Sequence, residues 1–302
     1  MTFEAFFAVL PFGLAVVMFG LGLELTLADF GRVATAPKAV LVVLACQIVV
    51  VPALGAALLL VLGLAPSLAL GVVVLLASPG GPMAAVFSHL AGGDVALNIT
   101  ATALNAALAF VTMPLVIGFA VGRLGVGGAV TVPPDKVVQV ALVVLLPAAL
   151  GMLVRRLRPH LAVRLQRPVR LLSIAVVFLA IVVAVAPQAA AFLRGLVAVG
   201  GLVLGLSVLS LTVGYVVPRL VRLGRPQAVA SSLEIGIHNV ALAITVCATV
   251  LGDSRAAVVP AMYGALMFGP AAVLTWFLAR RTPDQPSSGS RNSRRLPKGS
   301  WA

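Results

Sequence analysis

The chain of 302 residues is 61% hydrophobic and only 10% charged, with a mean hydropathy of +1.16. This composition excludes a soluble globular domain, because repeated apolar runs of about 20 residues or more are typical of polytopic helical membrane proteins. The runs are continuous and do not alternate in polarity, which excludes a transmembrane β-barrel.

The net charge of +13 does not indicate a nucleic-acid partner. The Lys and Arg residues lie in the segments between apolar runs and in the C-terminal region, as the positive-inside rule predicts for a protein in a lipid bilayer. Cys46 and Cys247 both fall in apolar runs, so no disulfide framework is expected.

Nine apolar spans can be drawn along the chain, separated mostly by Pro and Gly residues. Pro168 is the predicted boundary before the sixth span. The predicted spans are residues 3–25, 38–62, 67–91, 95–121, 136–157, 169–187, 195–218, 226–251 and 256–279. The first is interpreted as a retained span, because it has neither a basic start nor an obvious cleavage site.

The orientation follows from the basic residues. With the N-terminus outside, 17 of the 21 Lys and Arg residues fall on the cytoplasmic side, and one missed helix would invert everything after it. We therefore predict a multi-pass protein of the plasma (inner) membrane, with the N-terminus outside and the C-terminus in the cytoplasm. Residues 281–302 are rich in Ser, Pro, Gly and Arg and predict a disordered basic cytoplasmic tail.

Two spans are interrupted near their middles. The third contains Pro79, Gly80, Gly81 and Pro82, and the eighth contains Gly236 within a polar stretch. In lipid, such a break persists only inside protein or along a wet cavity. One interrupted span in each half is the pattern of a transporter with an inverted repeat and a midplane site, and half-helix ends would face an anionic head group. Two independent kinks without a role are the alternative.

Glu234 places a carboxylate in a span without Lys or Arg. An ionisable group at mid-membrane costs about 2.5–3.5 kcal/mol, so it persists only where it is paired or faces water. His238 stands four residues later, on the same face if the segment is helical. It is interpreted either as a titrating group or as a neutral histidine that hydrogen-bonds Glu234.

Other polar residues share these apolar spans. Asn98, Thr102 and Asn105 are spaced by four and three residues and form one stripe on the fourth span. The stripe is either interhelical hydrogen bonding, at about 0.6 kcal/mol per contact, or part of a site. Gln47 is alone in the second span and is expected to be functional, and Asn239 is expected to order the break or touch substrate.

The chain resembles the bile acid:sodium symporter family from about residue 17 to 278, as a nine-helix, bacterial-type homologue. The resemblance is carried by Met18–Phe30, by Pro37 and Lys38 with Gln47 and Pro52, by Pro79–Gly81 with His89–Leu97, and by Glu234–Ala243. It implies an all-α polytopic membrane protein with nine transmembrane helices, formed by an inverted-repeat core with two broken crossing helices and by a panel domain. Within one transporter unit (1–280), the core would be about 38–121 and 195–280, and the panel about 3–25 and 136–187.

The resemblance also implies an organic anion coupled to two sodium ions. One family site uses a Ser-Asn pair after the Pro-Gly-Gly, where this chain has Ala84 and Ala85, and its other side-chain oxygens fall on Asn98, Thr102 and Glu234. The second site reads Gln47, Glu234 and His238, with histidine in place of a glutamine. Methyl groups cannot ligate a hard cation, so the first site is expected to be weakened or absent. Histidine is instead a proton carrier near neutral pH.

We therefore predict a secondary active transporter, and no enzyme, that moves an organic anion by alternating access. The anion is bile-acid-like or a small carboxylate, and Na⁺ is the coupling ion through a partly retained site, with Gln47 and Glu234 as possible ligands. The alternative is a proton-coupled or sodium-independent carrier that uses Glu234 and His238, and a membrane sensor is a further one. No other cofactor is expected, and the substrate and oligomeric state do not follow from the sequence.

Overall fold

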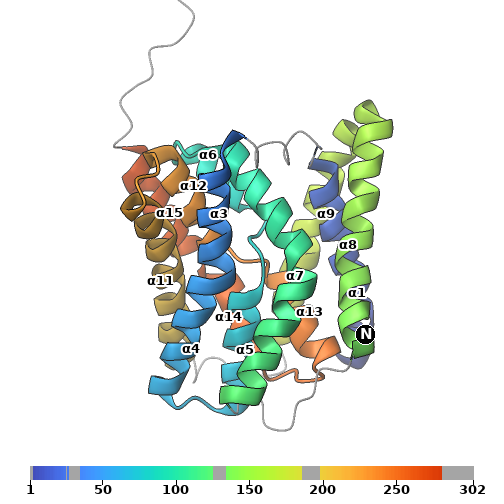
Figure 1. Ribbon diagram of the computed structural model, residues 1–302. Coiled ribbons are helices and arrows are strands. Elements are labelled where there is room, and N and C mark those ends of the chain that lie inside the picture. The colour runs from blue at the N-terminus through green and yellow to red at the C-terminus, as the bar shows by residue number, and fades with distance from the viewer. Residues whose placement is uncertain (1–2, 25, 27–34, 125–133, 186–197, 281–302) are drawn as a thin grey trace, which may run out of the picture.

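The computed structural model describes residues 3–24, 26, 35–124, 134–185 and 198–280, and the regular elements of these residues are all helices (Figure 1). They are α1 (Phe3–Glu24), α3 (Pro37–Ala45), η1 (Cys46–Val50), α4 (Val51–Leu62), α5 (Pro66–Ala77), α6 (Ala84–Leu90), α7 (Val95–Leu124), α8 (Pro134–Leu157), α9 (Pro159–Val185), α11 (Ala198–Leu220), α12 (Arg225–Gly236), α13 (Val240–Thr245), η3 (Val246–Val250), α14 (Val258–Leu266) and α15 (Phe268–Ala279). The predicted tail, 281–302, lies outside these residues.

Several helices are long and apolar enough to cross a membrane. Among the described residues these are Pro37–Leu62, Val199–Leu220 and Val258–Ala279, and α7 joins them if its two parts, bent by 59°, count as one span. α5 and α13 are shorter because the chain breaks beside them. The 12 residues of α5 rise only about 18 Å, against about 30 Å of hydrocarbon. An all-helical protein with several apolar helices is confirmed, and the number of spans stays a prediction.

The helix α9 differs from the predicted sixth span. It begins at Pro159 rather than 169 and contains Pro168 inside the helix, so the predicted boundary at Pro168 was wrong. The basic residues before Pro168 were placed between two apolar runs. Arg, Leu and Gln are nevertheless good helix formers, and 27 residues give a helix of about 40 Å, longer than the hydrocarbon layer.

A π-helical turn, η1, interrupts the continuous helix from Pro37 to Leu62. The N–H of Val51 bonds to the carbonyl of Cys46, five residues back, directly before Pro52, which has no N–H to donate. Gln47 lies inside this turn and is only 3% exposed. The turn therefore places the one amide side chain of this helix in the protein interior.

The helix α1 packs chiefly against α8 and α9, which stand together at one side of the bundle (Figure 1). Its contact with α8 depends on two glycines. A Cβ atom on Gly22 would overlap the carbonyl oxygen of Ala148, and one on Gly151 would lie 2.8 Å from the backbone nitrogen of Leu23. Small residues allow this close approach of two membrane helices.

Gly151→Ala is therefore expected to lower stability, because the added methyl group meets backbone that cannot rotate away. We expect a loss of about 1–3 kcal/mol, seen as a lower melting temperature in detergent. Gly122→Ala on α7 is the control, since a Cβ there meets nothing within 4 Å. Equal melting temperatures for the two variants would contradict this packing.

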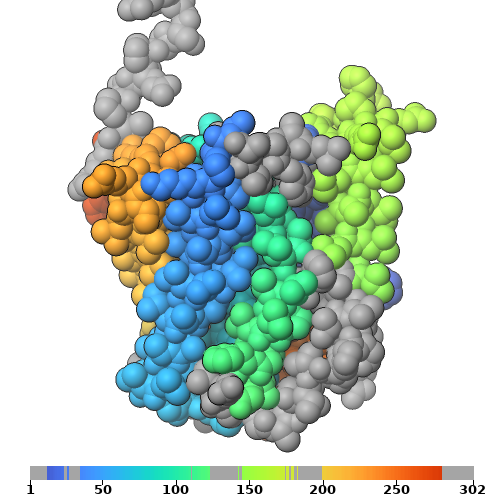
Figure 2. All heavy atoms as spheres, in the orientation of Figure 1, coloured from blue at the N-terminus to red at the C-terminus, as the bar shows by residue number. Residues whose placement is uncertain are grey.

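The most buried segment runs through α12 and α13. Every residue from 228 to 247 is buried. The helices α5, α7, α11 and α14 pack around this segment, and the side chains of α3, α4 and α7 cover one face of the molecule (Figure 2). The second interruption predicted from the sequence therefore lies at the centre of the fold.

Candidate functional site

Two chain breaks meet inside the bundle. The first separates α5 from α6, and the second separates α12 from α13. The N–H of Gly81 donates to the carbonyl of Ile237 at 2.6 Å, and the N–H of Asn239 donates to the carbonyl of Pro79 at 2.8 Å. These bonds pair the breaks antiparallel, with Gly80 opposite His238. Each break thus satisfies backbone groups that the other leaves open, as the membrane interior requires.

The sequence of the first break suits this pairing. Pro79 and Pro82 have no N–H to satisfy. A Cβ atom on Gly81 would lie 2.8 Å from the carbonyl oxygen of His238, so the second break can approach only a residue without a side chain. In the second break, the side-chain oxygen of Asn239 accepts from the N–H of Leu242 at 3.1 Å and caps α13.

Glu234 lies on α12, directly behind the first break. Its carboxylate is fully buried, accepts from the hydroxyl of Thr102 at 2.5 Å and lies 3.4 Å from the side-chain nitrogen of Asn105. Gly80 faces it, and a Cβ atom there would lie 2.6 Å from Oε2. No Lys or Arg is among the contacts that the structure gives this group. The carboxylate is thus held by neutral donors alone.

Three carboxamide oxygens near the breaks have no hydrogen-bond partner in the described structure. The side-chain nitrogens of Gln47, Asn98 and Asn105 donate to the Ser78 carbonyl, the Ala230 carbonyl and Glu234, respectively, which leaves the oxygens of all three. Buried acceptors of this kind normally have a partner. Oxygens are the ligands that hard cations prefer, and Asn105 is the residue of the three that meets the Glu234 carboxylate, so this pair fits a sodium ion. Ala84 and Ala85, in the first turn of α6, contribute no side-chain oxygen.

His238 lies in the second break and not on a helix. The prediction that it shares a helical face with Glu234 was wrong, because α12 ends at Gly236 and Ile237 is extended. Its Nδ1 lies 3.3 Å from the carbonyl oxygen of Ser78, the group that also accepts from Gln47. Its Nε2 is buried without a partner in the described structure. The described polar contact of this ring is therefore with the first break and not with Glu234.

Sequence reasoning missed Tyr263 of α14. Its hydroxyl donates to the carbonyl of Gly236 at 2.8 Å, and its ring meets the His238 ring edge-on at 5.3 Å between centroids. The contact satisfies a carbonyl where α12 ends. A tyrosine inside an apolar span was the available signal, because a buried hydroxyl needs a hydrogen-bond partner.

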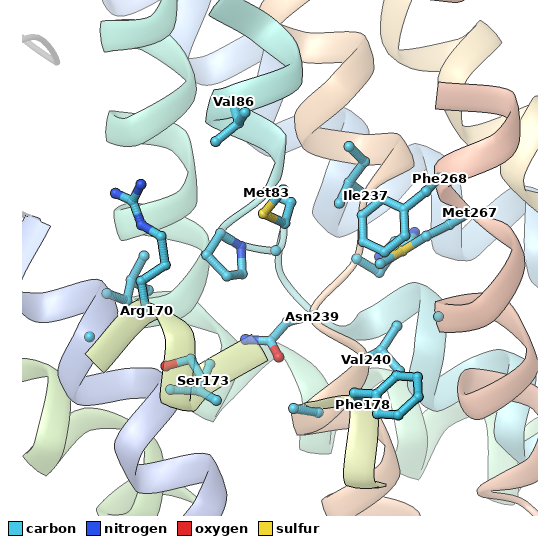
Figure 3. Close-up of a pocket in the computed structure, with 18 of the residues that line it drawn as sticks. Met83, Val86, Arg170, Ser173, Phe178, Ile237, Asn239, Val240, Met267 and Phe268 are labelled. Atoms are coloured by element: carbon cyan, nitrogen blue, oxygen red, sulfur yellow. The ribbon is translucent and has the colours of Figure 1, made fainter. Parts of the chain in front are cut away.

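A cavity of about 490 Å³ lies on the other side of the breaks, between them and the helices α1 and α9 (Figure 3). Gly81, Pro82, His238 and Asn239 contribute to its wall, and Glu234 does not. Most of the remaining lining is apolar and comes from α1, α6, α9, α14 and α15. The paired breaks therefore separate the buried carboxylate from a cavity large enough for an organic molecule.

The structure thus groups the predicted site residues in two clusters around the breaks. Thr102 and Asn105 of α7 gather with Glu234 and Gly80, and Asn98, one turn earlier, bonds to the Ala230 carbonyl of the same helix α12. Gln47 and His238 meet at the Ser78 carbonyl. The described contacts do not join Gln47 to Glu234.

Two broken helices that meet beside a buried carboxylate are characteristic of membrane transporters. A sequence profile of the Sodium Bile acid symporter family matches residues 11–194, more than half of the chain. The chain belongs to this family, whose members are membrane transporters of the symporter type and not enzymes. The family predicted from the sequence is confirmed.

Curated relatives carry related names. The chain is 32% identical to the mouse sodium/bile acid cotransporter 5 over 212 residues. These aligned residues make up 70% of this chain and 48% of the mouse protein. It is 27% identical over 231 residues to the uncharacterized sodium-dependent transporter YocS of Bacillus subtilis, covering 75% and 69%. It is 27% identical over 265 residues to the probable sodium/metabolite cotransporter BASS1 of rice, covering 85% and 64%. The match thus spans about half the length of the mouse relative.

Proposed function

We propose that this protein is a secondary active symporter that moves an organic anion by alternating access and is driven by sodium. The names of its relatives, sodium/bile acid and sodium/metabolite cotransporters, support this function. The observation that carries it in this chain is Glu234, fully buried beside the paired breaks with neutral hydrogen-bond donors. A carboxylate kept at this depth is a functional feature by default.

The two moving parts proposed are a panel of α1, α8 and α9 and a core of the other helices, within nine spans arranged as an inverted repeat. The close packing of α1 with α8 and α9 supports the panel, and one broken helix in each half supports the repeat. The cavity lies between α1 and α9 on one side and the breaks on the other, so a relative movement would open and close it.

The proposed orientation in the plasma membrane has the N-terminus outside and the C-terminus in the cytoplasm. Three helix ends lie at the same end of the bundle: the starts of α3 and α12 and the end of α15 (Figure 1). Lys38 and Arg225 lie in the first turns of α3 and α12, and Arg280 directly follows α15. This gathering of basic residues supports a cytoplasmic location for that end.

Sodium is proposed to bind as a transported ion, close to Glu234. The carboxylate and the unpartnered oxygen of Asn105 are groups that would ligate it, with Thr102 beside them. The unpartnered oxygens of Asn98 and Gln47, which belong to neighbouring contacts of the breaks, are the further candidate ligands. A cation there would balance the buried charge. It would also stabilise the contact between α7, α12 and the first break. Because Gly80 contacts Glu234 and the next residue, Gly81, lines the cavity, a bound ion would hold this part of the cavity wall in one position.

The second candidate is proton coupling through Glu234 and His238. It is favoured by one observation: His238 stands where the family pattern has an amide ligand, and its Nε2 has no partner in the described structure. A sodium jump at constant pH and a pH jump without sodium separate the two candidates.

The test is uptake into proteoliposomes of radiolabelled cholate, pyruvate and pantoate, with each gradient applied alone. Sodium-driven accumulation of at least one of these anions is the expected result. Accumulation driven only by the pH jump would replace sodium with protons. If neither gradient drives uptake of any of the three anions, the proposed function is wrong.

Restoring the family's Ser-Asn pair tests the weakened sodium site. Ala84→Ser with Ala85→Asn adds two oxygen ligands to the first turn of α6. We expect the sodium concentration for half-maximal uptake to fall about 10-fold, since single ligand-shell changes alter metal affinity by about 10–100-fold. The gain should disappear in a Glu234→Gln background. An unchanged sodium dependence in the Ser-Asn variant would show that this position does not contribute to ion binding.

A further inference from the structure

The polar part of the cavity wall is concentrated on one helix. Gln166, Arg170 and Ser173 of α9 line the cavity; Asn239 lies across from Ser173, and the Arg170 side chain extends from α9 toward the level of Met83 (Figure 3). Arg170 is the one Lys or Arg among the described lining residues, and these include no Asp or Glu. The formal charge among the described lining residues is therefore positive and comes from α9.

These groups all offer hydrogen-bond donors. The guanidinium of Arg170 is a positively charged group with five N–H donors, and it already interacts within the chain. Ser173, one turn later, has a hydroxyl that can donate. The oxygen of Asn239 already accepts from Leu242, so this side chain offers its NH₂ group. Donors combined with a positive charge suit a carboxylate or sulfonate.

The rest of the cavity suits an apolar body. Met83 and Val86 line it from the first break and α6, Phe178 from α9, and Met267 and Phe268 from the α14–α15 end (Figure 3). A volume of about 490 Å³ is within the range of pockets that enclose drug-sized ligands. One charged wall and an otherwise apolar lining match a molecule with a single charged end.

We infer that Arg170, with Ser173 and Asn239, binds the single anionic group of the substrate and makes α9 the element that selects for charge. The inference rests on the proposed function and deepens it. The apolar body of the substrate lies along Met83, Phe178 and Phe268. Because α9 and Asn239 lie on opposite sides of the cavity, a bound anion connects the panel to the core.

The competing explanation is that Arg170 only marks the cytoplasmic end of α9, as its basic neighbours would. Arg167 provides the matched control. It lies three residues earlier on the same helix, is exposed as Arg170 is, and differs from Arg170 in not lining the cavity. Arg170→Gln and Arg167→Gln remove the same charge from the same helix, so a role in topology alone predicts equal effects.

The experiment measures binding to the purified full-length protein by thermal shift. The test compounds are cholate, 4-phenylbutyrate and pyruvate, each paired with its carboxamide, which has nearly the same shape and no charge. Wild type and Arg167→Gln are expected to bind at least one acid about 10-fold more tightly than its amide. In Arg170→Gln this ratio should fall to about 1, with amide binding unchanged, because a charge-assisted hydrogen bond accounts for about 10-fold in affinity or more.

Ser173→Ala keeps the charge and should lower the ratio by about 3-fold, which maintains the test if Arg170→Gln does not fold. An unchanged ratio in Arg170→Gln, or in Ser173→Ala where that variant alone can be purified, would overturn the assignment of α9 and leave the proposed transport intact. Failure of the wild type to bind any of the acids would overturn both.

Discussion

Replacing Glu234 with glutamine is expected to reduce gradient-driven uptake at least about 100-fold while the protein stays folded. Glutamine has nearly the same shape, and its side-chain oxygen can still accept from Thr102, which now donates to the carboxylate at 2.5 Å. What it lacks is the negative charge. Mutation of an outer-shell partner already weakens a metal site by about 10–100-fold, and here the charged ligand itself is lost. The charge also has to be balanced at each step of transport.

The control for this variant is Thr275→Val on α15, which changes another buried polar side chain away from the paired breaks. It should transport like the wild type. Uptake of labelled anion under a sodium gradient is the readout, with the melting temperature of each variant measured in detergent. Wild-type accumulation by Glu234→Gln would show that the buried carboxylate has no part in coupling.

Gly80→Ala is expected to lower both the stability and the transport rate of the protein. The new Cβ atom would overlap the Glu234 carboxylate, lying 2.6 Å from Oε2. The backbone cannot easily retreat, because the neighbouring Pro79 and Gly81 are bonded to the second break at 2.8 and 2.6 Å. We expect a loss of about 1–3 kcal/mol in stability and a fall of at least about 10-fold in transport.

A double variant identifies the cause of that effect. In a Glu234→Ala background the methyl group of Gly80→Ala has room, so most of the lost stability should return, although transport should not. Gly118→Ala on α7 is the control, since a Cβ there meets nothing within 4 Å and alanine favours the helix. The same loss of stability in both backgrounds would contradict the contact between Gly80 and Glu234.

Local patterns in the sequence were sufficient to find the interruptions and the buried carboxylate. Pro79 and Pro82 cannot donate backbone hydrogen bonds, and Glu234 is the acidic residue of an apolar span, so both features are visible in short stretches of sequence. The same local reasoning placed Asn98, Thr102 and Asn105 on one face of a helix, and in the structure this stripe reaches Glu234.

The remaining features depend on contacts between residues far apart in the chain. The carbonyl of Ser78 accepts from Gln47 and also meets His238, 160 residues later, and no local pattern indicates this. His238 was placed on a helix because the spacing of four residues assumes that the helix continues, whereas it ends at Gly236. Arg170 was counted only as a basic residue near a span end, because its place in the cavity depends on how α9 packs against α1.

The most direct test of the account is the flux of radioactive sodium into proteoliposomes, measured with and without the anion that the uptake experiment identifies. Coupling is reciprocal, so if sodium at Glu234 promotes anion binding, the anion must also promote sodium binding. We predict that the anion accelerates sodium entry in the wild type and has no effect in Glu234→Gln. Anion uptake that proceeds without any accompanying sodium entry would contradict the account.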